Sequence, residues 1–299
     1  MKAKNQALKE THQEDAEIDL TTCNLAWSLL DCGKYEEGLA LYKSIPTESE
    51  IKYLGMSRAL TKTGHFYEAK KLLKKANKQF LESPSLLNAI GILHADFEYY
   101  TEAIKYYDLA IQAIEDWDNH HWILFNKGQA LYALGCYEDA LTIFKKLIVI
   151  YSDEPKYLTA LGYCYLNMGY PEDAATYFKA AIHNEHSTPD VYNGLFCSYY
   201  DMNLISDAID IALDGLRKFS DEDPLMYNNV GAGYFEMGWL NEARDIVDKG
   251  LMIFPDNEIL INLLEEIEDA RNIPDKDNDL TFMLLLILVA TIKKLRLRK

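Results

Sequence analysis

The sequence is short of basic residues. Lysine and arginine number 30 among the 299 residues, against 47 aspartates and glutamates, and the formal net charge is −17. Proteins that bind nucleic acid gather lysine and arginine on one face, where they neutralise phosphates. The acidic balance therefore argues against nucleic acid as a partner.

Cysteine, and the motifs that mark common catalytic sites, are also scarce. The five cysteines all fall in segments that we expect to be helical, and none forms a C-x-x-C pair: Cys23, Cys32, Cys136, Cys164 and Cys197. Small core thiols in a reducing compartment fit this pattern. Residues 1–18 are polar and contain no apolar stretch typical of a secretory signal, so we expect the protein on the cytoplasmic side. Neither a G-x-S-x-G motif nor a phosphate-binding glycine loop is present. We predict a protein that is not an enzyme and has no cofactor.

Patterns that suggest a metal site are incomplete. Four histidines lie in two close pairs, His120 with His121 and His183 with His186, but no cysteine lies near them and zinc needs three or four convergent ligands. Asp275–Asp279 resembles the start of a calcium loop. Leu280 and Leu286, however, stand where such a loop needs its turn glycine and its bidentate glutamate. No metal site is predicted.

What the sequence does contain is a repeat. A phrase of glycine, any residue, aromatic, glutamate, a further residue and alanine recurs, and a small residue returns at intervals of 31, 34, 37, 34, 34 and 35 residues at Gly38, Ala69, Ala103, Ala140, Ala174, Ala208 and Ala243. A period near 34 is the length of a helix-turn-helix solenoid unit.

Each unit reads as two helices. In the first, apolar residues at helical spacing surround a glycine, as in Leu158, Leu161 and Gly162, which lets the partner helix approach closely. In the second, the repeat alanine is followed by a large residue four positions later, as in Ala174 and Phe178. Prolines precede several first helices, where the missing N–H is tolerated: Pro84, Pro155, Pro189 and Pro224.

These residues resemble the tetratricopeptide repeat family. The resemblance implies an all-α, right-handed superhelical solenoid of about seven repeats over residues 19–255, preceded by a polar segment (1–18). After the repeats we expect a capping helix (256–271), an acidic linker (272–279) and an apolar tail helix with a basic end (280–299). The pattern changes at Gly38, which replaces the repeat alanine, at Phe196, which replaces the first-helix glycine, and at Gly215 and Gly250.

The resemblance also implies that the first helices line a concave surface that binds a partner peptide. Asparagines stand at or next to equivalent places on these helices: Asn24, Asn88, Asn126, Asn193, Asn228 and Asn229. An amide both donates and accepts, so it suits the backbone of an extended peptide, although asparagine is also tolerated on any exposed helix face. Farther along are aromatic residues that could form pockets or fill contacts between repeats: Trp27, Tyr132, Tyr163, Tyr200 and Phe235.

Charges near this surface set the expected partner. Acids recur near the ends of the first helices, at Asp31, Asp96, Asp201 and Glu236, and favour a basic or neutral partner segment. Relatives that bind a chain end use repeated basic residues as a carboxylate clamp. Here Arg58, Lys62 and Lys156 are not in repeating positions, so a chaperone C-terminus is not the expected ligand.

The tail is the second functional feature. An uncharged run, Leu280–Ile292, is followed by basic residues, and we predict membrane or tail contacts for Leu280, Phe282, Leu284, Leu285, Leu286, Ile287, Leu288, Val289, Lys293, Lys294, Arg296 and Arg298. Thirteen helical residues span about 20 Å, against a hydrocarbon core of about 30 Å. The short run with a basic end is similar to the anchors of tail-anchored mitochondrial and peroxisomal proteins. A membrane anchor is the favoured reading, with a helix docked on protein and an interfacial helix as the alternatives.

Together these features predict a scaffold or adaptor without catalytic activity, held at a membrane by its tail. The alternative is a soluble, self-assembling scaffold or chaperone whose apolar tail packs on a neighbouring copy or on a partner, so that homo-oligomers form.

Overall fold

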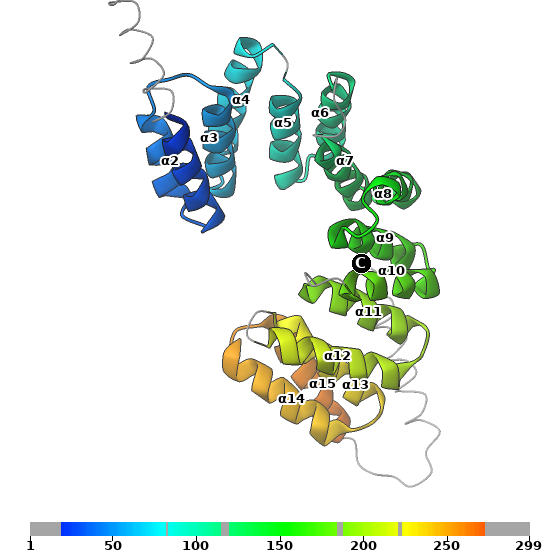
Figure 1. Ribbon diagram of the computed structural model, residues 1–299. Helices are drawn as coiled ribbons and strands as arrows, with labels where there is room; N and C mark the ends of the chain where they lie inside the picture. Colours follow the sequence, from blue (N-terminus) through cyan, green and yellow to red (C-terminus); the bar gives the residue numbers. More distant parts are fainter. Residues whose placement is uncertain (1–18, 82, 115–119, 184–187, 221–222, 273–299) are drawn as a thin grey trace, which may run out of the picture. The chain divides into compact units, whose positions relative to one another are not determined.

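A computed structural model describes residues 19–81, 83–114, 120–183, 188–220 and 223–272. The described part is helical from residue 19 to residue 31, and then contains the helices labelled in Figure 1: α2 (Tyr35–Ser44), α3 (Glu50–Lys62), α4 (Phe66–Gln79), α5 (Pro84–Asp96), α6 (Tyr100–Gln112), α7 (His121–Ala133), α8 (Tyr137–Ile150), α9 (Pro155–Asn167), α10 (Pro171–His183), α11 (Pro189–Asp201), α12 (Ile205–Phe219), α13 (Pro224–Glu236), α14 (Leu240–Ile253) and α15 (Glu258–Arg271). No strand lies within these residues.

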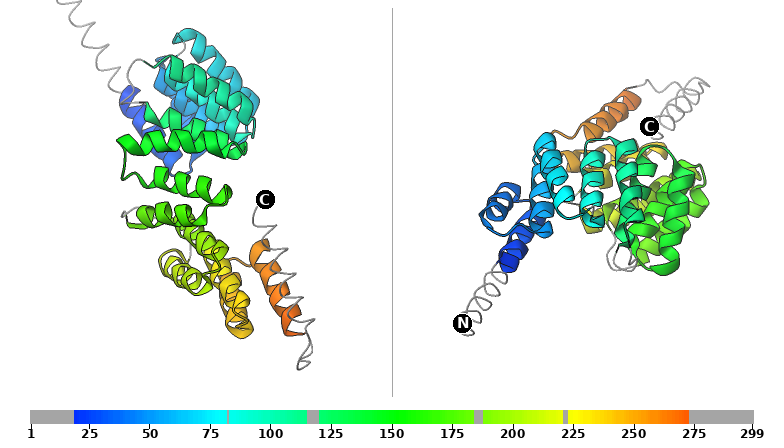
Figure 2. Two further views of the ribbon diagram at one scale, coloured as in Figure 1. Left: turned by 90° about the vertical axis from the view of Figure 1, so that its right-hand side faces the viewer. Right: turned by 90° about the horizontal axis from the view of Figure 1, so that it is seen from above.

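The chain divides into two compact units, an N-terminal unit of residues 1–143 and a C-terminal unit of residues 144–299, with the boundary inside α8. Within each unit the helices pack as successive pairs, such as α5 with α6 and α9 with α10 (Figure 2). First helices of successive pairs also contact each other, for example α3 with α5 and α11 with α13, and α15 packs against α13 and α14. The predicted all-α class built from helix-turn-helix repeats is confirmed.

Small residues and large rings fit together between the helices as the repeat predicts. The repeat alanines from Ala69 to Ala243 are fully buried. The Phe178 ring on α10 fills the space left by Gly162 on α9 and by Gly194 on α11, and a Cβ atom on either glycine would collide with it. In the N-terminal unit, Tyr107 fills the equivalent space beside Gly91. Glycine is required at these three positions because a larger residue would need space that a ring already fills.

Two departures from the pattern have physical reasons. A Cβ atom at Gly38 would lie 2.5 Å from Leu30 Cδ2 and 3.1 Å from the Ala26 carbonyl oxygen, so an alanine there would force the Leu30 side chain to move. In the sixth repeat the large and small residues exchange places. Phe196 stands on the first helix, and Ala212 replaces the ring on the second helix in the same buried cluster.

The turns between paired helices need a left-handed residue. Glycine supplies it at Gly64, Gly135 and Gly169, with φ of 80°, 83° and 83°. Where glycine is missing, Glu98 and Asn203 adopt the same conformation, with φ of 63° and 61°. The turn geometry is therefore retained at the cost of strain, since a side chain disfavours this region by about 1–2 kcal/mol.

The cysteine prediction is partly wrong. Cys23 and Cys164 are buried in helices, and Cys197 is a half-buried helical residue. Cys32 is exposed in the turn before α2, and Cys136 lies in the turn before α8. Both residues lie just outside a helix, since the first helix ends at residue 31 and α8 begins at Tyr137.

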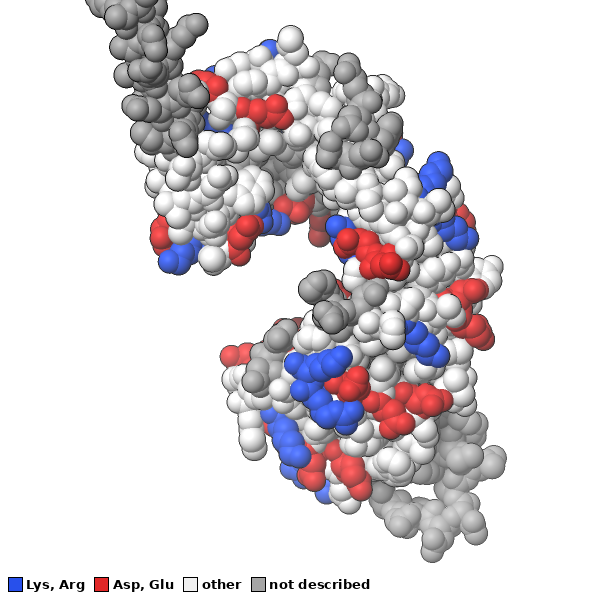
Figure 3. Space-filling view, viewed as in Figure 1, with Lys and Arg blue, Asp and Glu red and all other residues white. Residues whose placement is uncertain are grey.

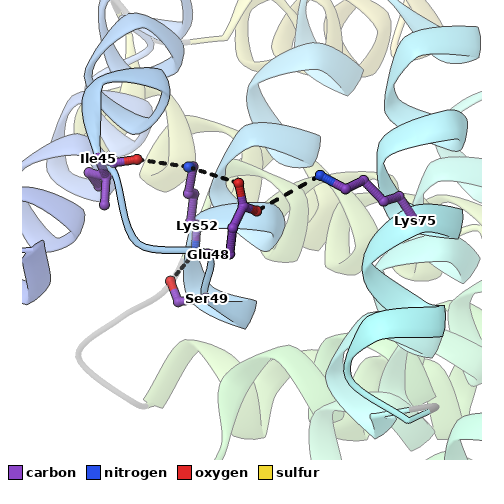
Figure 4. A network of polar contacts seen from close by, with 5 residues as sticks. All are labelled: Ile45, Glu48, Ser49, Lys52 and Lys75. Atoms are coloured by element: carbon purple, nitrogen blue, oxygen red, sulfur yellow. Dashed lines mark hydrogen bonds and ion pairs between the residues drawn. The ribbon is translucent and has the colours of Figure 1, made fainter.

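A buried lysine ties the first two repeats together (Figure 4). Lys52 Nζ donates a hydrogen bond of 2.7 Å to the carbonyl oxygen of Ile45, the residue after α2, and lies 3.6 Å from Glu48. The Ser49 hydroxyl accepts from the Lys52 backbone N–H and caps α3. These contacts satisfy a charge that would otherwise be costly to bury.

Candidate interaction surface

Neighbouring first helices are joined through the predicted asparagines. In the N-terminal unit, Asn126 Nδ2 on α7 donates to Asn88 Oδ1 on α5 at 3.0 Å. In the C-terminal unit, Asn229 Nδ2 on α13 donates to Asn193 Oδ1 on α11 at 3.0 Å. Asn88 and Asn229 are each only 3% exposed. Each bridge uses one donor and one acceptor, so part of the asparagine ladder connects the repeats to each other.

The remaining asparagines are more accessible. Asn24 is exposed and Asn228 is half-buried. The sequence analysis missed Asn262 on α15, which lies 34 residues after Asn228 and is exposed. The repeat period was a signal that could have found it.

The predicted aromatic residues divide between core and surface. Phe235 is buried in the cluster that α13, α14 and α15 share. Tyr132 is half-buried beside the Tyr137 ring, at 5.3 Å between centroids. Tyr163 and Tyr200 use their hydroxyl groups to reach the next first helix. Tyr163 donates to the carbonyl oxygen of Asp190 at 2.7 Å, and Tyr200 donates to Glu236 Oε2 at 3.0 Å.

In the N-terminal unit the acids at the ends of the first helices are ion-paired. Arg58 lies 2.9 Å from Asp31, with its guanidinium 4.9 Å from the Trp27 ring centre. Lys62 lies 3.0 Å from Asp96. Figure 3 shows basic residues (blue) beside acidic residues (red) along the lower edge of this unit. The basic residues considered for a carboxylate clamp are thus occupied with neighbouring acids, and Lys156 likewise lies 3.6 Å from Glu154.

In the C-terminal unit the equivalent acids gather around a tyrosine. Asp201 follows Tyr200 at the end of α11. Glu236, at the end of α13, accepts a hydrogen bond from the Tyr200 hydroxyl. Burial, followed by the charges of Glu236, Asp201 and Glu266, raises the pKa of Tyr200. Within the described residues no lysine or arginine forms an ion pair with Asp201 or Glu236. We call the surface formed by Asn193, Tyr200, Asp201, Asn228, Glu236 and Glu266 the acidic face.

The charge difference extends along the helices. The first helices α9, α11 and α13 together with α15 carry eight acidic residues and two basic ones. In the N-terminal unit, residues 19–31 with α3, α5 and α7 carry four of each. On α15, Glu268 lies 3.1 Å from Arg244 and 3.2 Å from Arg271. The helices that form the acidic face therefore carry an excess of acidic residues.

The other predicted features have the following outcomes. Among the described residues no group of three or more histidine, cysteine or acidic side chains is placed to hold a metal ion. No helix of the described part is both long enough and apolar enough to cross a membrane. His186, the linker and every tail residue predicted to contact a membrane lie outside the described residues.

Comparisons with known proteins agree with this fold. Residues 155–183, which cover α9 and α10, match the model of the tetratricopeptide repeat. No curated protein matches the sequence. Similar solved structures include the Cut9–Hcn1 hetero-tetramer of the APC/C, with 18% identity and a TM-score of 0.63 over 81% of this chain. A tetratricopeptide repeat protein from Parabacteroides merdae has 14% identity and a TM-score of 0.60 over 84% of this chain, and 98% of its own length is covered. PilF from Pseudomonas aeruginosa has 17% identity and a TM-score of 0.58 over 72% of this chain, with 96% of its own length covered.

The fold is thus that of a tetratricopeptide repeat solenoid. This chain spans 48% of the length of the Cut9–Hcn1 chain that it matches. At these identities the likeness concerns the fold alone, and a fold reused so widely does not define a partner.

Proposed function

We propose that this protein is a scaffold without catalytic activity, and that the acidic face of its C-terminal unit binds a partner segment with basic and apolar side chains. The observation that carries the proposal is the pair of carboxylates at Asp201 and Glu236, which no basic residue of the described chain neutralises. Lysine or arginine of a partner would supply the missing charge, and unscreened opposite charges also speed association.

Polar groups on the same face suit the backbone of the partner. Asn228 and Asn262 lie at equivalent places on α13 and α15, and both have solvent-accessible side chains. Their amides would donate to and accept from an extended or helical main chain. The exposed Ile259 side chain, one turn before Asn262, offers an apolar contact beside them.

The N-terminal unit is a weaker candidate for the same partner. Its first helices carry equal numbers of acids and bases, and Asp31 and Asp96 are already paired. A basic segment would have to break those ion pairs before it gained new ones. A protein partner is in keeping with the hetero-tetrameric state of one similar structure.

The sequence predicts two other roles for residues 280–299. A membrane anchor remains a prediction of the sequence, and so does self-assembly through the tail. The acidic face favours a protein contact for this segment instead, because the five basic residues of the segment are opposite in charge to that face.

Peptide binding would test the proposal. Fluorescence anisotropy would be measured with a labelled 14-residue peptide of alternating leucine and lysine, and with the same peptide carrying glutamate in place of lysine. We expect the lysine peptide alone to bind, and the Asp201→Asn, Glu236→Gln double variant to bind it about fivefold more weakly, since each exposed charge contact contributes about 0.2–1 kcal/mol.

The matched control is Asp31→Asn with Asp96→Asn, which alters the same helix positions in the N-terminal unit. We expect this variant to bind the lysine peptide like the natural protein. Equal weakening by both double variants, or equal binding of both peptides, would contradict the proposal.

A further inference from the structure

The chain itself contains a segment with the chemistry that the acidic face requires. Residues 280–292 carry no charge and are almost entirely apolar. The seven residues that follow contain Lys293, Lys294, Arg296, Arg298 and Lys299 and no acid. The two properties that we assign to a partner segment therefore occur together in one stretch of twenty residues.

This segment begins close to the acidic face in the sequence. The described chain ends at Asn272, directly after α15, and α15 contributes Glu266 to the face. The eight residues 272–279 can span at most about 27 Å when fully extended. Helix α15 has 14 residues and is about 21 Å long. A segment that starts at residue 280 can therefore return to any point along α15 without strain in the linker.

The last described helix also leaves apolar side chains uncovered. Ile259 is 45% exposed and Ile261 is 36% exposed on α15. The final element of a solenoid normally presents a polar outer surface, because no further repeat covers it. Ile259 lies on the same side of α15 as Asn262 and Glu266, since the three are spaced at i, i+3 and i+7. The acidic face thus has an apolar border that suits an apolar segment.

We propose that residues 280–299 dock on the acidic face of their own chain, with the apolar run against α15 and the basic residues against Asp201, Glu236 and Glu266. This inference rests on the proposed function, because the docked segment occupies the surface that binds the partner. Residues 280–299 then act as an internal competitor, and a partner binds only the fraction of molecules in which this segment is displaced.

Zero-length cross-linking of the full-length protein tests the contact. A water-soluble carbodiimide joins lysine amines to carboxylates that touch them, and an equal mixture of ¹⁴N- and ¹⁵N-labelled protein separates links within a chain from links between chains. We expect Lys293, Lys294 or Lys299 to be joined to Asp201, Glu236 or Glu266 in peptides of a single isotope, and these links to fade at 1 M salt.

Three results of that experiment would overturn the inference. The first is that the three lysines form no link to any carboxylate of the acidic face. The second is that the links join different isotopes, which would make a second copy the occupant. The third is that the protein floats with phosphatidylcholine vesicles and the links disappear, which would make a membrane the destination of residues 280–299.

A binding measurement separates this inference from the proposed function. The variant has glutamine in place of Lys293, Lys294, Arg296, Arg298 and Lys299, and the probe is the leucine–lysine peptide. If the acidic face is covered in nine molecules of ten, the variant binds the probe about tenfold more tightly than the natural protein. Equal affinities would overturn the inference and leave the proposed function standing, whereas absence of binding to both proteins would overturn the proposed function itself.

Discussion

The two units of this protein place acidic residues at the same helix positions but give them different contacts. At the ends of its first helices the N-terminal unit places Asp31 against Arg58 and Asp96 against Lys62, so the charges cancel within the fold. The C-terminal unit places Asp201 and Glu236 beside Tyr200, and among its described residues no lysine or arginine forms an ion pair with either acid. The core packing is alike in both. The comparison indicates that a solenoid can keep its internal contacts constant while the acid at one surface position is ion-paired in one unit and hydrogen-bonded to a tyrosine in the other.

The largest expected effect on stability comes from the buried rings that both units pack against glycine. Phe178→Ala in the C-terminal unit and Tyr107→Ala in the N-terminal unit each empty a fully buried space beside glycine. We expect each to lower the free energy of unfolding by about 3–5 kcal/mol. Urea denaturation followed by amide hydrogen exchange would assign each loss to its own unit. A loss below about 1 kcal/mol in one unit would show that the two cores are not packed alike.

A second prediction concerns pH and the N-terminal unit alone. His94 is 4% exposed, lies among aromatic rings that include Phe66 and Tyr106, and neither ring nitrogen has a hydrogen-bond partner within the described residues. Burial, together with the charges of Lys70 and Lys74, lowers its pKa from 6.5, and the charge of Glu102 opposes this shift in part. The unfolded chain therefore binds the proton more tightly than the folded chain.

Stability that depends on neutral His94 is present above pH 6.5 and is lost as the pH falls below that value toward the pKa of the folded state. The slope is at most about 1.4 kcal/mol per pH unit. Hydrogen exchange at several pH values would measure it, and His94→Phe should remove this component in the N-terminal unit. An unchanged pH slope in that variant would exclude His94 as the source.

A third prediction compares the two strained turns. Glu98→Gly in the N-terminal unit should raise the free energy of unfolding by about 1 kcal/mol, because glycine adopts positive φ without steric cost. Asn203→Gly in the C-terminal unit should give a smaller gain, since asparagine tolerates this conformation better than glutamate does. Thermal denaturation of both variants tests the order, and a larger gain at Asn203 would contradict it.

The smallest effect tests the charge difference directly. Asp96→Asn removes an exposed ion pair and should cost less than about 1 kcal/mol. In the variant with glutamine at the five basic positions of residues 293–299, Asp201→Asn removes one of several neighbouring carboxylates and should leave stability unchanged or slightly higher. Urea denaturation at low and high salt would measure both, and a clear loss at Asp201 would mean that this carboxylate has a structural partner.

Much of the fold could be predicted from the sequence because close packing depends on residue size. The repeat alanines, Gly162 with Phe178, and the prolines that begin α5, α9, α11 and α13 all have the predicted places. The positive φ of Glu98 could not be predicted from the sequence. Most of the other turns have a glycine at this place, whereas here tertiary packing imposes the conformation on a glutamate.

The surface was less predictable because it depends on pairings between side chains of different repeats. The sequence predicts Asn193 and Asn229 on neighbouring helices, but the hydrogen bond between them depends on how α11 packs against α13. Asp31 and Asp201 look equivalent in the sequence. They differ because arginine stands 27 residues after Asp31, whereas no such base follows Asp201 on α13.

The ring of Phe178 has a consequence for how this array unfolds and how it could have grown. Because one side chain fills holes in two successive repeats, at Gly162 and at Gly194, its stabilisation belongs to the junction between them and to neither repeat alone. Loss of the fifth repeat would leave the sixth with an unfilled hole. The repeats on either side of this ring are therefore cooperative, and a duplication or deletion would be tolerated only when its breakpoints carry the ring and both glycines together.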